Sequence, residues 1–184
     1  MARAKRAKSA GEGTPDAITL LKADHRQVED WFGQFEKARD ANKKQALATQ
    51  ICKALKVHTM IEEEIFYPAF LEATGEKDIH HEAEVEHNGA KKLIAEIEES
   101  SPDDDYFDAK VSVLSEMIKH HVKEEEGPGG MFSESRDSDM DLDMLGEQLA
   151  ARKAELEGES DDMDEEPPAG GRKSRGQSER RQHG

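Results

Sequence analysis

Between residues 14 and 126 the apolar residues recur every three or four positions, the spacing of one face of an α-helix. Four such stretches follow one another, over about 14–40, 43–74, 79–99 and 103–126. Short polar segments connect them, and the alternation typical of strands is missing. Four long amphipathic helices with short connections predict an all-α fold, an antiparallel up-down four-helix bundle.

Local signals place the ends of these helices. Thr14 is the expected N-cap of the first helix, with Pro15 at its first position. Gly75 is a suitable residue to end the second helix, and Pro68 should kink or shorten its last part, because the ring clashes with the carbonyl four residues back. The glycines and proline of 127–130 should end the fourth helix.

The remaining chain divides into an accessory helix and two tails. An apolar edge predicts a fifth helix over 138–157, lying against the outside of the bundle; it comprises Leu142, Leu145, Leu149 and Leu156. The bundle domain is expected over 14–133. Residues 1–13 are interpreted as a flexible basic arm and 158–184 as a disordered tail, because both are polar and biased in composition.

Histidines occupy unusual positions in this pattern. Each apolar stripe carries one of them: His25, His58, His87 and His121. Glu62 and Glu125 each follow a histidine by four residues, so each shares a helix face with an imidazole. Folded as an antiparallel bundle, the four helices should bring these six side chains into one region of the core.

A buried carboxylate is costly unless it is paired or bound to a metal. Two buried glutamates and four buried histidines can hardly satisfy one another by hydrogen bonds alone, whereas a pair of divalent cations would neutralise the carboxylates and accept the imidazole lone pairs. Mixed imidazole and carboxylate ligation suits Fe, Zn or Mn. The sequence therefore predicts a metal site formed by His25, His58, Glu62, His87, His121 and Glu125.

Neighbouring polar and aromatic residues are weaker candidates. His120 lies off the stripe and should face solvent, and most of the flanking glutamates, such as Glu63 and Glu126, should be solvated or lie just outside the site. The aromatic residues of the helices are interpreted as core packing: Trp31, Phe32, Phe35, Phe66 and Phe70.

At these residues the chain resembles the hemerythrin family in its wider HHE cation-binding form. The matching strings are LLKADH at 20–25, HTMIEEEIFYP at 58–68, EH at 86–87 and HVKEE at 121–125. The resemblance implies two non-haem iron ions joined by an oxo or hydroxo group, with Glu62 and Glu125 as bridges. It also implies reversible binding of O₂, or related chemistry with NO or peroxide.

Two departures from the oxygen carriers stand out. Ala83 occupies the position of a second histidine on the third helix, and the fourth helix offers Glu125 four residues after its histidine instead of an aspartate at five, where Glu126 stands. The chain thus resembles bacterial and iron-responsive HHE domains more closely. One metal position is expected to be open or filled by Glu84, His80 or Glu126.

The composition of the chain limits the classes of binding partner that we expect. The net charge is −16, and 37% of residues are charged against 34% hydrophobic, so neither nucleic acid nor an anionic membrane is an expected partner. No apolar stretch is long enough to span a bilayer, and the single cysteine, Cys52, fits a reducing compartment. We therefore expect a cytoplasmic protein, with the tail charges solvated.

Three functional hypotheses follow. The first is a module that binds O₂ or NO, or senses oxygen or iron supply, through the di-iron site. The second is a di-iron enzyme that reduces peroxide or NO, although the chain offers no cysteine pair to carry electrons. The third is a metal-free interaction protein that acts through its acidic segment. The pattern of histidines favours the first, and whether the chain is an enzyme stays open.

Overall fold

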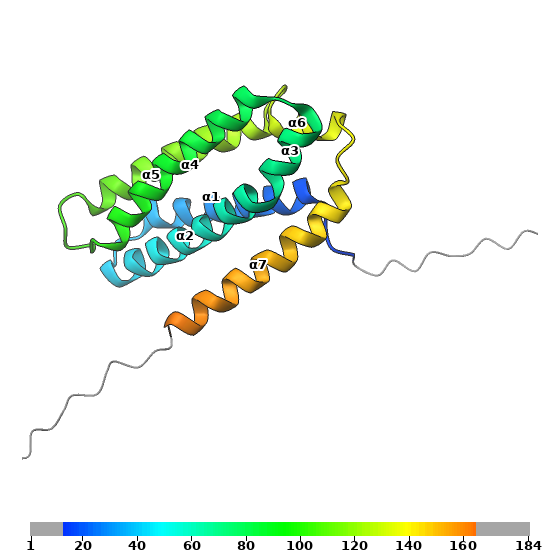
Figure 1. Ribbon diagram of the computed structural model, residues 1–184. Coiled ribbons are helices and arrows are strands. Elements are labelled where there is room, and N and C mark those ends of the chain that lie inside the picture. Colours follow the sequence, from blue (N-terminus) through cyan, green and yellow to red (C-terminus); the bar gives the residue numbers. More distant parts are fainter. Residues whose placement is uncertain (1–12, 165–184) are drawn as a thin grey trace, which may run out of the picture.

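The structure is a computed structural model, and it describes residues 13–164. Four long helices form the bundle: α1 (Ala17–Lys37), α2 (Ala41–Ile61), α4 (Lys77–Glu98) and α5 (Phe107–Glu126). A π-helical turn, η1 (Glu62–Phe66), joins α2 to α3 (Tyr67–Thr74), and α6 (Met131–Asp137) and α7 (Leu142–Asp164) follow the bundle. Figure 1 shows α1 and α2 side by side, α4 and α5 above them, and α7 along the outside. The fold is all-α, as predicted, and the described residues include no strand.

The first helix begins later than the sequence indicated. Its N-cap is Asp16, whose carboxylate accepts hydrogen bonds from the backbone N–H and the hydroxyl of Thr19 at 2.9 and 2.8 Å. Thr14 and Pro15 therefore lie outside the helix, and the prediction of Thr14 as N-cap is wrong. Aspartate and threonine are both good caps, and the bidentate contact with Thr19 decides between them.

The second predicted helix is interrupted, as Pro68 suggested. Proline cannot donate a backbone hydrogen bond, and its ring would press on the carbonyl of Glu64 in a regular helix. The chain avoids this clash by forming one wider, π-helical turn at η1, where the backbone N–H of Tyr67 bonds to the carbonyl of Glu62. Beyond it α3 leaves the direction of α2 (Figure 1) and ends at Gly75, whose φ of 72° is the left-handed conformation that glycine allows.

The helix after the bundle is part of the folded core. Leu145, Leu149 and Leu156 are buried where α7 packs on α1 and α2. At Gly146 a Cβ atom would lie 2.2 Å from the carbonyl oxygen of Pro15, so glycine permits the close approach of α7 to the start of α1. The helix continues past Gly158, where the sequence predicted its end, to Asp164. Residues 1–12 and 165–184, which hold most of the two predicted tails, lie outside the described residues.

Two apolar clusters fill the bundle, one toward each end. The first contains Phe35, Ile51, Leu114 and their neighbours, and the second contains Leu21, Phe70, Leu149 and theirs. On α1, α2 and α4 the histidine lies near the boundary between the clusters; His25, for example, lies between Leu21 of one and Val28 of the other. On α5 the buried apolar residues, from Phe107 to Val122, all belong to the first cluster, and His121 lies near the end of that run. The core is therefore apolar at both ends and polar in a single layer across the middle.

Candidate metal centre

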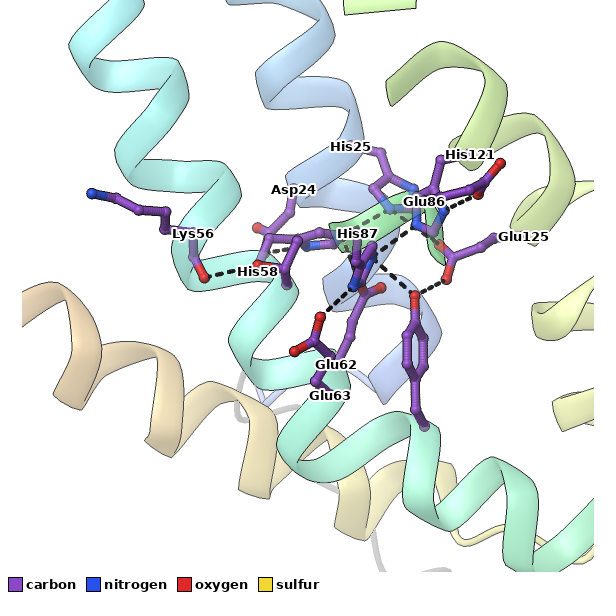
Figure 2. Close-up of polar contacts among 12 residues, drawn as sticks. Asp24, His25, Lys56, His58, Glu62, Glu63, Glu86, His87, His121 and Glu125 are labelled. Carbon is purple, nitrogen blue, oxygen red and sulfur yellow. Dashed lines mark hydrogen bonds and ion pairs between the residues drawn. The ribbon is translucent and has the colours of Figure 1, made fainter. Parts of the chain in front are cut away.

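The polar layer brings together all six residues that the sequence singled out. His25, His58, Glu62, His87, His121 and Glu125 are each at most 5% exposed. Their imidazole Nε2 atoms point inward: those of His25 and His58 are 3.0 Å apart, and those of His87 and His121 are 3.2 Å apart. Figure 2 shows these side chains converging from separate helices.

Each of the two buried carboxylates lies between both pairs of imidazoles. Oε2 of Glu62 is 3.2 Å from Nε2 of His58 and 3.4 Å from Nε2 of His87. Oε2 of Glu125 is 3.5 Å from Nε2 of both His25 and His121. One oxygen of each glutamate therefore lies between the two pairs of imidazoles, where it could contact both of two bound ions.

Four further carboxylates hold the imidazoles from outside. Glu126, Glu63 and Glu86 face Nδ1 of His25, His87 and His121 at 2.9, 2.9 and 2.8 Å, and Asp24 lies 3.5 Å from Nδ1 of His58. At His25, His87 and His121 the carboxylate accepts a hydrogen bond, so Nδ1 carries the proton and Nε2 of a neutral ring keeps its lone pair. At His58 the contact with Asp24 is an ion pair, and the enclosed Nδ1 has no hydrogen-bond partner. The Nε2 atoms of all four rings face the centre, and outer contacts of this kind orient histidine ligands in metal sites.

The outer contacts form a closed ring around the bundle. Asp24 of α1 faces His58 of α2, and Glu63 of η1 faces His87 of α4. Glu86 of α4 faces His121 of α5, and Glu126 of α5 faces His25 of α1, which closes the ring. Each outer carboxylate also meets a base nearer the surface; Glu126 bonds to Lys22 and Arg26, Asp24 to Lys153 and Glu63 to Lys91. The lowered pKa of Asp24 and Glu126 follows from these contacts, which outweigh partial burial.

Burial and mutual repulsion perturb the inner groups strongly when no cation is bound. Burial, helped by the charge of Glu62, raises the pKa of Glu125 to about 8. Burial and the neighbouring His58 lower the pKa of His25 to about 4, whereas the Glu62 carboxylate overcomes burial and raises the pKa of His58 to about 10. Groups of like charge thus lie close together in a region without water. A cation bound between the two carboxylates would reduce their repulsion.

Unpaired oxygens test whether a cation fits. Both oxygens of Glu62 and Oε2 of Glu125 are fully enclosed and have no hydrogen-bond partner. Buried polar atoms in a folded protein are almost always paired, so these three need a partner. Two groups of potential ligand atoms surround them, His25–His58–Glu62 and Glu62–His87–His121, with the atoms of each group within 4.8 Å of one another. The donor set fits two cations that share Glu62.

Sequence reasoning missed one residue of the site. The hydroxyl of buried Tyr67 lies 3.1 Å from Nε2 of His87 and 3.1 Å from Oε1 of Glu125. In a regular α-helix of 3.6 residues per turn, Tyr67 would point about 140° away from Glu62. The π-turn removes most of that rotation, so both side chains face the centre; such turns are frequent at functional sites. The interrupting Pro68 was the available signal.

The residues suggested for the open position lie elsewhere. His80 is near Glu84, with 3.8 Å between Nδ1 and Oε2, and neither belongs to the inner groups. Glu126 contacts His25 only from the outer side, at Nδ1. The place beside His87 is taken by the phenol of Tyr67. His120 is mostly exposed, as the sequence predicted. The predicted core aromatics Phe32, Phe35, Phe66 and Phe70 are buried, and Trp31 is half-buried against the cluster that contains Phe32 and Phe35.

Fold and site together define a helical bundle with a histidine–carboxylate centre in its core. Residues 16–128 match the Hemerythrin HHE cation binding domain. Because this match covers more than half of the chain, the protein belongs to the hemerythrin HHE cation-binding family, as the resemblance indicated. A solved structure, a Hemerythrin HHE cation binding domain-containing protein from Mycobacterium kansasii, is similar in fold, with a TM-score of 0.66 and 20% identity; the match covers 79% of this chain and 90% of that one.

A curated relative was also found. A protein of Nostoc sp. named DNA nickase is 32% identical over 107 residues, which is 58% of this chain but only 30% of the relative. The chain therefore spans less than a third of that protein. Within residues 13–164 no helix is long and apolar enough to cross a membrane.

Proposed function

We propose that the protein binds two iron ions, bridged by an oxo or hydroxo group, and uses them to bind O₂ or NO or to sense oxygen or iron. The single observation that carries the proposal is the position of Glu62, buried between two pairs of histidines with both oxygens unpaired. His25 and His58 would hold one ion and His87 and His121 the other, with Glu62 and Glu125 shared. The family membership supports a cation in this place.

Iron is favoured over zinc by the composition of the centre. Zinc in proteins is usually four-coordinate, so two imidazoles and two shared carboxylates would leave a zinc ion little room for a further ligand. Two imidazoles and shared carboxylates for each ion leave coordination positions without a protein ligand, which suits iron that binds a small molecule. Such open positions are what a diatomic ligand needs.

The proposal is tested on the protein purified aerobically from iron-supplemented cells. We expect about two iron atoms per chain, with near-ultraviolet charge-transfer bands of an oxo-bridged centre. Reduction should bleach these bands, and O₂ or NO should produce new ones. Chelation should markedly lower the melting temperature, because six polar side chains then lie in the core without cations. Protein that binds no iron, with a melt insensitive to chelator, would rule the proposal out.

A second candidate function is reduction of peroxide or NO by the same centre. The observation that favours it is the phenol of Tyr67, which lies beside His87 and Glu125 and can donate a proton to a bound ligand. Turnover of peroxide or NO with an added reductant, lost in His58→Ala, would support an enzyme. Activity no higher than that of free iron would count against it.

We also propose that nucleic acid is not the partner. The activity named for the Nostoc relative is not transferred, because the shared region is a minor part of that protein. A net charge of −16 repels a polyanion. Binding of duplex DNA by the purified full chain at physiological salt would contradict this.

A further inference from the structure

A cavity of about 450 Å³ opens between α4, α5 and the loop of residues 127–130. We propose that this cavity, called here the acidic cleft, is the route by which divalent cations reach the centre. We further propose that two glutamates of its lining, Glu86 and Glu124, dock the cation first together with His120, which contacts both; these three residues are called here the mouth. The inference rests on the proposed function, since it concerns how the metal ions arrive. It assigns a role to residues that the centre itself does not use as ligands.

The floor of the acidic cleft reaches the centre directly. Its lining includes His121 and Glu125, two of the candidate ligands. Glu125 is 3% exposed, and its Oε2 has no hydrogen-bond partner. An unpaired carboxylate oxygen at the inner end of an open cavity is a group that a cation would meet on arrival. A cavity of about 10 Å³ also touches the centre, at His25, His58, His87 and His121, but it has room for no more than about one water molecule. Another, of about 70 Å³ beside Asp24 and Trp31, is lined by none of the six inner residues.

A small residue keeps the cleft open. Ala83 lines the cavity on α4, one turn before His87. Its methyl group leaves space beside Glu125 that a larger side chain would fill. The loop of residues 127–130 bounds the opposite side of the cavity and packs tightly on the end of α5. At Gly130 a Cβ atom would lie 2.0 Å from the carbonyl oxygen of Glu124. The opening is thus bounded by a small helical residue and a glycine loop.

The mouth of the cleft carries negative charge and an imidazole. Glu82, Glu86 and Glu124 line it, with Lys123 as the one basic lining residue. Nε2 of His120 lies 3.0 Å from Oε1 of Glu124 and 3.3 Å from Oε1 of Glu86. These three residues offer ligand atoms within 4.8 Å of one another. An imidazole with two carboxylates suits Fe²⁺, Mn²⁺ or Zn²⁺, and a concave acidic surface raises the local concentration of cations.

Glu86 connects the mouth to the centre. One oxygen faces His120 outside, and the second accepts a hydrogen bond from Nδ1 of His121, whose Nε2 points inward. A cation held at the mouth therefore lies beside the residues that line the floor. Glu124 and Glu125, neighbours on α5, both line the cavity, one exposed and the other buried.

The test measures the rate of iron uptake by the metal-free full chain. Anaerobic Fe²⁺ is added, and unbound Fe²⁺ is captured by ferrozine at timed intervals. The mouth variant is His120→Asn with Glu124→Gln, and the plug variant is Ala83→Leu. Matched controls are Glu116→Gln, an exposed glutamate of α5, and Ala95→Leu, an exposed alanine of α4. Circular dichroism and the final iron content show whether each variant folds and fills.

We expect the mouth variant to load about tenfold more slowly than the wild type at low salt and at a similar rate at high salt, where the acidic field is screened. The plug variant should load slowly at both salt concentrations, and all variants should reach the same final iron content. Loading of the mouth variant at the wild-type rate in low salt would overturn the proposal, even if the plug variant failed to fold. Wild-type protein that takes up no iron would instead defeat the proposed function.

Discussion

The hydroxyl of Tyr67 donates a hydrogen bond to Oε1 of Glu125 at 3.1 Å, across the interior of the bundle. The two residues are 58 positions apart in the chain and come from α3 and α5. Because the same hydroxyl lies 3.1 Å from Nε2 of His87, it occupies the side of the centre where the helix bearing Ala83 supplies no second imidazole. The pKa of Tyr67 is well above its ordinary value through burial and the nearby carboxylates, so in the metal-free protein the hydroxyl keeps its proton and acts as a hydrogen-bond donor.

Replacing Tyr67 by phenylalanine removes this hydroxyl and keeps the ring. We expect Tyr67→Phe to fold and to bind iron, with the ion at His87 and His121 held about 10–100-fold more weakly, because an orienting contact to its ligands is lost. Competition with a graded chelator measures the affinity. The control is Tyr106→Phe, since Tyr106 is the second tyrosine and is 73% exposed. Equal affinity in the two variants would contradict the role of Tyr67.

Glu62 should be required for both ions. In Glu62→Gln the shared carboxylate becomes a neutral amide. Both proposed ions then lose the negative charge that lies between His58 and His87. We expect iron content to fall from about two per chain to near zero, measured by elemental analysis. The matched control is Glu64→Gln two residues on, because Glu64 is exposed and bonds to Arg152 of α7. A Glu62→Gln protein that still carries two irons would refute the bridging role.

The metal-free protein should be about equally stable between pH 4.5 and 6.5, where the effects of Glu125 and His25 oppose each other, and should lose stability as the pH rises above 6.5. Glu125 has a pKa of about 8 when folded and 4.5 ordinarily, so the folded state holds a proton that the unfolded chain releases, and stability falls as pH rises from 4.5 to 8. His58, raised to about 10, acts likewise above pH 6.5. His25, lowered to about 4, costs stability as pH falls below 6.5. Thermal melts of chelated protein from pH 5 to 9 measure this.

Glu125→Gln provides the check on that pH dependence. The amide cannot ionise, so the metal-free variant should lose less stability than the wild type between pH 6.5 and 8. A metal-free wild type whose melting temperature climbs steadily from pH 6.5 to 9 would contradict the assignment.

Helix α7 should contribute to the stability of the whole bundle. Leu149 is fully buried against α1 and α2, and Leu149→Ala should lower the free energy of unfolding by about 2–5 kcal/mol, through lost burial and the cavity left behind. Urea titration followed by circular dichroism measures it. Met144 lies on the exposed side of the same helix, and Met144→Ala should change the free energy by about 0.5 kcal/mol or less. A similar small effect for both would show that α7 does not stabilise the bundle.

The periodicity of the sequence was enough to predict the bundle and to select six residues that meet in its core. His25 and His121, for instance, are nearly a hundred residues apart, yet each stands on an apolar stripe, and a polar residue on such a stripe must be buried with its helix. The apolar stripes could not predict residues whose position depends on an irregular turn in a helix. The π-turn rotates Tyr67 into the centre, and a helical wheel drawn through Glu62 places it wrongly.

The outer carboxylates were predicted only in part: Glu63 and Glu126 were expected to be solvated or to lie just outside the site, but the imidazole that each contacts was not predicted. Each stands beside an inner residue in the chain, as Asp24 does next to His25 and Glu63 next to Glu62. Yet each contacts an imidazole of another helix, as Glu63 contacts His87. Sequence spacing gives the face of a residue within its own helix, but not the offset between helices that determines such cross-contacts.

The ring of outer carboxylates couples the orientations of the four histidine side chains. An imidazole such as His87 cannot turn without releasing Glu63, and Glu63 stands next to Glu62, which faces His58 as well. Because the circuit runs through every bundle helix and returns to its start, loosening at one point is passed to the next. The centre should therefore form or fail as a unit during folding, and partial versions of it should be rare.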